Sequence, residues 1–127
     1  MAHEILNLKS VHPTDGYSHV AKAGNTLYIA GQVAKNLQGH LVGQGDFETQ
    51  ARQVFSNLKN ILEETGGNLN NIAKMTTFLT HHSYREVYRK VRQKFLQGPL
   101  PANTLLIVGS LASPDYLIEV EAIAVLD

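Results

Sequence analysis

The most informative stretch for the fold is Leu117-Ile118-Glu119-Val120-Glu121-Ala122-Ile123-Ala124-Val125-Leu126. Side chains along it alternate in character between two faces, as in a β-strand. One face of this strand is wholly apolar, and its alanines allow close packing under helices. That face consists of Ile118, Val120, Ala122, Ala124 and Leu126. The opposite face presents Glu119 and Glu121, which should therefore point away from the helices.

The two carboxylates have two interpretations. On a solvent-exposed face they are ordinary surface groups, which is the simpler interpretation, because polar outer faces are normal in antiparallel sheets. In a subunit interface they would be partly buried. Burial raises the pKa of a carboxylate, and such a group can hold or deprotonate water. Glu119 is therefore a candidate general acid or base.

Two segments have the apolar spacing of amphipathic helices. The first runs from Asp46 to Thr65, with Asp46 as the predicted N-cap and Gly66-Gly67 as the stop. The second begins at Ser83, where Ser83-x-x-Glu86 has the pattern of a capping box. It should continue for about four turns and end at Gly98-Pro99.

The remaining apolar segments predict six strands, and Gly24-Asn25 predicts a tight hairpin between the second and third. The order β-β-β-α-β-α-β-β over residues 1–127 indicates one α+β domain, a mixed sheet with two helices on one face. The predicted strands are Glu4–Lys9, Ser18–Ala23, Thr26–Val33, Asn71–Thr80, Thr104–Leu111 and Leu117–Leu126.

This layout leaves one face of the sheet without a cover. Thr26–Ala30 and Leu105–Val108 are apolar on both sides, so we expect self-association through the sheet into a dimer or a ring. The segment Lys35–Gly45 carries three glycines and predicts a mobile loop or a loose hairpin.

The composition limits the available chemistry. The chain has 11 Lys and Arg, 11 Asp and Glu, and a formal net charge of zero, so no global field favours nucleic acid or an anionic membrane. It has no cysteine, which removes thiolate nucleophiles and cysteine-based metal sites. No stretch approaches the roughly 18 consecutive apolar residues of a membrane helix, and the N-terminus lacks a signal-peptide pattern. We expect a cytoplasmic protein without a membrane or nucleic-acid partner.

The histidines do not predict a metal site. None of the six lies in a metal-binding spacing such as HExxH. His81 and His82 are neighbours at a predicted strand end and should point to opposite faces, so that they could not easily share one ion.

Two further features have a functional and a simpler structural interpretation. Gly31 ends an apolar strand, where a missing Cβ would let a ligand approach the backbone amide, although such a glycine is usually a bend or bulge. Arg85, Arg89 and Arg92 form a stripe at helical spacing. The stripe could contact RNA phosphates, but a solvated outer face is the simpler interpretation.

Several motifs in one order resemble the RidA/YjgF family, also called the liver perchloric-acid-soluble protein family. The resemblance covers about Val11 to Val125, and the closing Glu-x-Glu-Ala-x-Ala strand is its most specific part. The motifs are Asp15-Gly16-Tyr17-Ser18, Leu27-Tyr28-Ile29-Ala30-Gly31-Gln32, Gln50 with Asn57-Leu58, and Ile118-Glu119-Val120-Glu121-Ala122-Ile123-Ala124.

The resemblance implies a chorismate-mutase-like fold and a homotrimer with small-molecule clefts between adjacent subunits. Active members of the family are enamine/imine deaminases, which hydrolyse reactive 2-imino acids to 2-oxo acids and ammonia without a cofactor. By resemblance, Glu119 positions the attacking water, the Gly31 amide polarises the substrate, and Tyr17 closes the pocket.

The chain departs from the family at four pocket positions. The arginine that grips the substrate carboxylate follows Pro-Ala in the family, whereas Asn103 follows Pro101-Ala102 here. Ala30 replaces the usual serine, Tyr88 replaces a pocket asparagine, and Leu105 replaces a small residue. Without the bidentate arginine, a neutral or less acidic substrate fits better than a 2-imino acid.

Two functions from different classes stay open. The first is hydrolysis of an imine, enamine or related C–N metabolite, with Glu119 as the catalytic residue. The second is a non-catalytic trimer that binds a small metabolite in the same cleft. An endoribonuclease that depends on Arg85, Arg89 and Arg92 ranks behind both.

Overall fold

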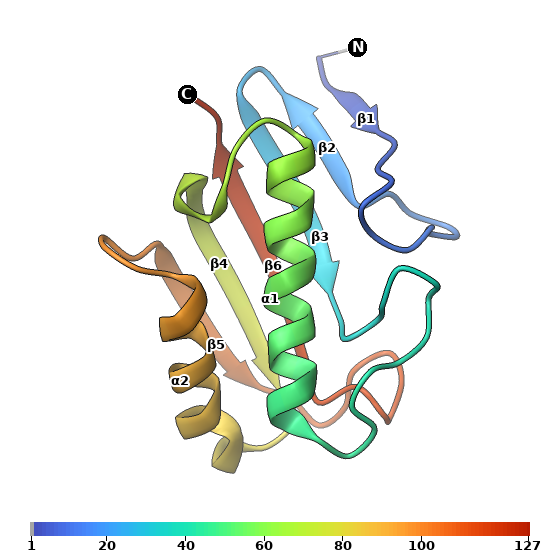
Figure 1. The fold of residues 1–127 in the computed structure, drawn as a ribbon, viewed down its shortest axis with the longest axis vertical. Coiled ribbons are helices and arrows are strands. Elements are labelled where there is room, and N and C mark those ends of the chain that lie inside the picture. The colour runs from blue at the N-terminus through green and yellow to red at the C-terminus, as the bar shows by residue number, and fades with distance from the viewer. Residues whose placement is uncertain (1) are drawn as a thin grey trace.

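The structure is a computed structural model that describes residues 2–127. Both helices lie on one face of a single twisted sheet (Figure 1). The six strands are ordered β1-β2-β3-β6-β4-β5, and only β4 and β5 are parallel neighbours. The elements are β1 (Glu4–Leu6), β2 (Val20–Ala23), β3 (Thr26–Gln32), α1 (Phe47–Glu64), β4 (Ile72–Leu79), α2 (Arg85–Phe95), β5 (Ala102–Ile107) and β6 (Ile118–Val125).

The predicted element order and the mixed sheet with two helices on one face are confirmed. Each predicted strand is present, although most are shorter than the apolar runs suggested. The hairpin between β2 and β3 is also confirmed, because Ala23 pairs with Thr26 across a two-residue loop. Only Gly24 of that loop has a positive φ, at 57°.

The predicted start of the second helix is wrong. A 3-10 turn, His82–Tyr84, precedes α2, and the His81 side chain accepts a hydrogen bond from the Ser83 amide. Ser83 therefore does not form the expected capping box, and Glu86 instead pairs with Arg89. The helix also stops at Phe95, before Gly98-Pro99. The His81 ring therefore caps this short turn, whereas Tyr84, the residue before α2, makes no capping bond through its side chain.

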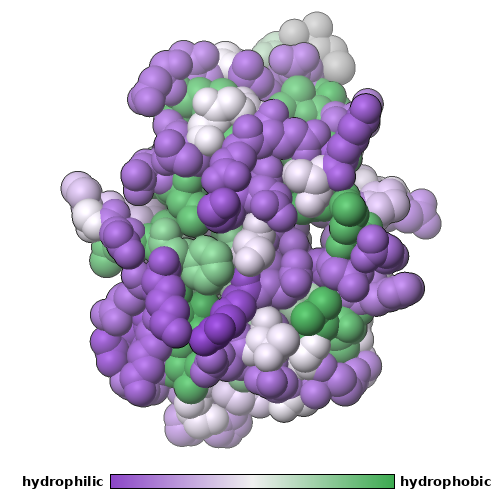
Figure 2. All heavy atoms as spheres, in the orientation of Figure 1, coloured by the Kyte–Doolittle hydropathy of each residue, from purple (hydrophilic) through white to green (hydrophobic). Residues whose placement is uncertain are grey.

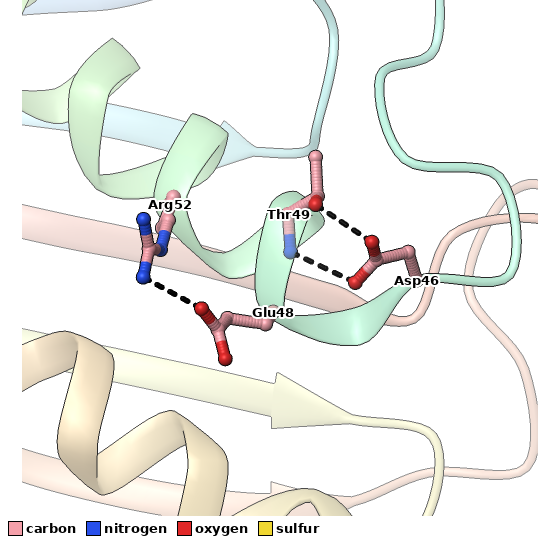
Figure 3. A network of polar contacts seen from close by, with 4 residues as sticks. All are labelled: Asp46, Glu48, Thr49 and Arg52. Carbon is pink, nitrogen blue, oxygen red and sulfur yellow. Dashed lines mark hydrogen bonds and ion pairs between the residues drawn. The ribbon is translucent and has the colours of Figure 1, made fainter.

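The N-terminus of α1 agrees with the prediction. Asp46 accepts hydrogen bonds from the amide of Thr49 at 3.2 Å and from its hydroxyl at 2.8 Å (Figure 3). These bonds lower the pKa of Asp46. In the first turn, Glu48 pairs with Arg52, one turn later, at 2.6 Å (Figure 3). Satisfied amides and acidic groups at this end stabilise the start of the helix.

The core lies between the sheet and the two helices. Phe55, Leu58 and Leu62 of α1 are fully buried against the apolar face of β6, where Val120 and Ala124 are also fully buried. On the outer side, hydrophilic side chains cover much of both helices (Figure 2). The apolar alternation of β6 therefore predicted the buried face correctly.

No helix among residues 2–127 covers the opposite face of the sheet (Figure 1). Ile5, Ala21, Tyr28 and Ile123 lie side by side across β1, β2, β3 and β6. Ile5 is 45% exposed and Tyr28 is 50% exposed. This arrangement is consistent with the predicted self-association.

Two buried amide side chains on α1 hold the loops at one end of the sheet. Gln50 donates to the carbonyl oxygens of Gly43 and Asp115, both at 3.0 Å, and accepts from the Leu117 amide at 2.9 Å. Asn57 donates to the carbonyl oxygens of Val33 and Lys35. Residues 35–45, expected as a mobile loop or loose hairpin, have the hairpin form, with a bridge between Lys35 and Leu41.

We predict that Gln50→Ala strongly destabilises the fold, because it leaves three backbone groups without their partner. Unmet buried groups of this kind cost about 1–3 kcal/mol each when water cannot replace the partner, so a loss of roughly 3 kcal/mol is expected. Urea unfolding checks this result. Gln93→Ala, on the exposed side of α2, is the matched control, and equal midpoints for the two variants would contradict the assignment.

Candidate functional site

A cavity of about 340 Å³ opens where the uncovered sheet face meets the loops at the ends of β3 and β6. It brings together four of the residues singled out in the sequence, which are Tyr17, Ala30, Gly31 and Glu119. The far wall contains Lys35 and Tyr116, together with Val33 and Ala112. The cavity is therefore the candidate functional site.

Glu119 lies directly against Gly31. A Cβ added to Gly31 would come within 1.9 Å of Glu119 Oε2, so only glycine leaves room for the carboxylate at this place. The sequence had suggested that the missing Cβ serves ligand access to the backbone. In the structure, the absence of a side chain at Gly31 instead makes room for the Glu119 carboxylate of the neighbouring strand β6.

The surroundings raise the pKa of Glu119 above its ordinary value. Burial is the larger cause, and the neighbouring carboxylate of Glu121 adds to it. On β4, Phe78 is the register partner of Glu119, so an apolar side chain and a glycine flank the carboxylate. A carboxylate of raised pKa exchanges protons closer to neutral pH, as general acid/base chemistry requires.

A bulge in β3 lies beside the carboxylate. Ile29 pairs with Ala122 and Gln32 with Val120, so β3 advances three residues while β6 advances two. The extra residue falls at Ala30 or Gly31. Bulges leave backbone groups outside the regular ladder and often lie next to active sites. The bulge interpretation of Gly31 is confirmed, and it does not exclude a role in binding.

Tyr17 is half exposed at the mouth of the cavity and is supported by a histidine pair. Its ring meets His19 edge-on at 6.1 Å, and His19 meets His12 edge-on at 4.8 Å. His19 Nε2 bonds to the His12 carbonyl at 2.8 Å, while its Nδ1 faces Gln32 Nε2 at 3.0 Å. Burial lowers the pKa of His19. A neutral ring therefore anchors the segment that carries Tyr17.

Lys35 and Tyr116 are members of the site that the sequence did not indicate. The Lys35 ammonium lies 5.8 Å from the centre of the Tyr116 ring. Both residues are in loops, far apart in the chain, and no local spacing connects them. The sequence contains one indirect signal for these two residues, which is that Gln50 and Asn57 match positions of the family. In the structure these two amides bond to the loops that carry Tyr116 and Lys35.

The other three singled-out residues form a separate group. Tyr88 is a buried residue of α2, and its hydroxyl lies 2.8 Å from the hydroxyl of Thr77 on β4. Thr77 in turn donates to Asn103 Oδ1 at 3.1 Å, and Leu105 is its register partner on β5. In one chain, Tyr88, Asn103 and Leu105 do not line the cavity that contains Glu119.

The histidine pair His81-His82 and the arginine stripe of α2 make contacts within the described residues. His81 and His82 do not point to opposite faces as expected, because they lie in a turn, and their rings stack at 4.5 Å. No group of three metal-binding side chains occurs in residues 2–127. Arg89 pairs with Glu86, and the Arg92 guanidinium lies over the Tyr88 ring.

The fold and the cavity define a class of small α+β proteins with a carboxylate site at the end of an open sheet. The family model described as Endoribonuclease L-PSP matches residues 7–126. The chain belongs to this family, the RidA/YjgF family, as its sequence motifs had indicated.

A solved structure supports the same assignment. RidA from the Antarctic bacterium Psychrobacter has a TM-score of 0.90 and 32% sequence identity, covering 97% of this chain and 99% of that one. A 2-iminobutanoate/2-iminopropanoate deaminase of Dermatophagoides farinae is 28% identical over 115 residues, 91% of this chain and 89% of that protein.

The cellular compartment stays a prediction. In residues 2–127 no helix combines the length and the apolar character needed to cross a bilayer. A mitochondrial protein, MMF1 of Saccharomyces cerevisiae, is 36% identical over 109 residues, covering 86% of this chain and 74% of that protein. Relatives are therefore not confined to the cytoplasm.

We predict that Gly31→Ala moves the Glu119 carboxylate out of its place and returns its pKa toward the ordinary value. The new Cβ and Oε2 cannot coexist, and the side chain can rotate away. NMR titration of the Glu119 carboxyl carbon measures this change. Gly109→Ala is the matched control, since an added Cβ there meets nothing within 4 Å. An unchanged titration in Gly31→Ala would contradict the assigned contact.

We also predict that Glu119→Gln raises the unfolding temperature at pH 7. The pKa of Glu119 is higher in the folded state than the ordinary 4.5, so ionisation opposes folding above that raised pKa. The gain should shrink as the pH falls through the raised pKa and vanish below the ordinary value of 4.5, where both states hold the proton. Thermal unfolding at several pH values tests this, with the exposed Glu4→Gln as control. A gain that grows toward low pH would have the wrong sign.

Proposed function

We propose that this protein is a hydrolytic deaminase of imines or enamines and that Glu119 is its catalytic residue. The observation that carries the proposal is the half-buried Glu119 carboxylate of raised pKa, held against Gly31 in an open cavity. The deaminase activity for which the Dermatophagoides relative is named supports the same reaction class.

The reaction requires little besides a positioned water. Glu119 accepts a proton from water as the oxygen attacks the carbon of the C=N bond, forming a carbinolamine. That proton passes from Glu119 to nitrogen. The hydroxyl proton of the carbinolamine then also moves to nitrogen through Glu119, the C–N bond breaks, and ammonia leaves as the C=O bond forms. An enamine reaches the imine by gaining a proton on carbon and losing one from nitrogen. Proton transfer by a positioned group contributes about 10²–10⁴-fold to such rates.

The other walls have supporting roles in this proposal. An amide at the Ala30–Gly31 bulge donates to the substrate, and Tyr17 closes the mouth of the cavity. The buried His19 holds Tyr17 in place through their edge contact. No cofactor takes part in the proposed reaction.

We further propose a homotrimer in which the cleft is completed by a neighbouring copy. The uncovered face, with half-exposed Tyr28 and Leu106, favours burial against another subunit. Asn103 is exposed at the edge strand β5, and an adjacent subunit could bring it to the cavity. Light scattering of the purified protein should then give three times the 14.0 kDa chain mass, whereas a monomer would contradict the assembly.

The deaminase proposal predicts faster ammonia release from freshly generated 2-iminobutanoate in the presence of the protein. Glu119→Gln should lose at least about a hundredfold of the acceleration, since a neutral amide cannot take the proton. Glu4→Gln is the matched control for loss of one carboxylate.

Two outcomes would contradict this proposal. Acceleration that survives in Glu119→Gln would exclude Glu119 as the group that activates water. No acceleration by the wild-type protein would instead favour the non-catalytic, metabolite-binding alternative for the same cavity.

A further inference from the structure

The cavity that contains Glu119 also contains a cation. Lys35 is the one basic side chain among its lining residues in the described chain. Its ammonium lies over the Tyr116 ring, which also lines the cavity. Glu119 and Lys35 therefore border the same volume of about 340 Å³.

The backbone of Lys35 is firmly fixed. Its amide donates to the Val33 carbonyl at 2.8 Å, and its carbonyl accepts from Asn57 Nδ2 at 3.0 Å. Asn57 is buried, and its Oδ1 accepts from Gln53 at 2.8 Å. The buried Asn57 side chain of α1 thus fixes the position of the Lys35 backbone. A fixed backbone is what a preorganised binding residue requires.

The charge of Lys35 is not used within the described chain. The three ion pairs of the described chain involve the basic residues Arg52, Lys59 and Arg89, and none involves Lys35. The pKa of Glu119 is raised by burial and by Glu121, and neither cause is a cation. Lys35 and Glu119 therefore do not neutralise each other, and each stays available to a ligand between them.

We propose that the Lys35 ammonium binds the carboxylate of the ligand in this cavity and thereby sets its specificity. The ligand class is a short 2-imino or 2-oxo acid, with its carboxylate at Lys35 and its C=N or C=O carbon near Glu119. This inference rests on the proposed function for the reacting end of the ligand. The Dermatophagoides relative is named for its action on two such anionic acids.

This assignment revises the expectation of a neutral substrate. That expectation followed from Asn103 in place of an arginine and did not include Lys35. Asn103 already accepts a hydrogen bond from Thr77, whereas Lys35 forms no ion pair with any residue in 2–127. Lys35 as a whole is partly buried, and water screens a partly buried charge less, which strengthens its attraction for a carboxylate.

Binding of the unreactive acid 2-oxobutanoate, measured by calorimetry against neutral 2-oxobutanamide, tests the proposal directly. The wild-type protein should prefer the acid. Lys35→Met should weaken binding of the acid about tenfold or more, because a charge-assisted contact is lost, and leave binding of the amide unchanged. Lys35→Arg should keep most of the preference. Lys94→Met, exposed on α2, is the matched control.

Kinetics separate this proposal from the deaminase proposal. Lys35→Met should raise KM for 2-iminobutanoate by about tenfold with a smaller effect on kcat. Glu119→Gln should reduce turnover and still bind 2-oxobutanoate. Binding that depends on Lys35 without any turnover would refute the deaminase and keep the anion site.

Three results would overturn the anion site. They are no binding of 2-oxobutanoate by the wild-type protein, an unchanged preference for the acid in Lys35→Met, and loss of that preference in Arg89→Met instead. An unfolding temperature of Lys35→Met close to that of the wild type shows that the variant is folded.

Discussion

The antiparallel pairing of β3 with β6 is the constraint on which the site depends. It places the carboxylate of Glu119 against Gly31, where a single added carbon would occupy the same space. The bulge in β3 lies at this point of the ladder, so the strand changes its hydrogen-bond register where the carboxylate lies. A regular ladder with an ordinary side chain would be more stable locally and would leave no room for the charged group.

Buried polar side chains on α1 fix the conformations of the loops, which the pairing of the strands alone does not determine. Gln50 and Asn57 are buried on α1, and the side-chain NH2 group of each donates to two carbonyl oxygens of the loops. Burying an amide is favourable only when its partners are present, so each side chain selects one loop conformation. The helix thus stabilises the sheet through its leucines and positions the cavity walls through its amides.

The sequence predicted what depends on periodicity. Alternation in β6 identified the face of Glu119, and the three-and-four spacing identified both helices. It did not predict His81 as a cap, because a ring nitrogen can replace a hydroxyl without any pattern in the chain. It also did not predict Lys35 and Tyr116 as neighbours, because the two loops meet only after the sheet has assembled.

The separation of charges in the cavity follows from the same architecture. A direct pair between Lys35 and Glu119 would lower the pKa of the carboxylate and occupy the ammonium. Instead, burial and Glu121 raise the pKa of Glu119, while Tyr116 faces the lysine. Two strand ends and two loops therefore hold a proton acceptor and an anion-binding group apart. A ligand with an anionic end and an electrophilic carbon satisfies both groups, whereas a neutral ligand leaves the lysine without a partner.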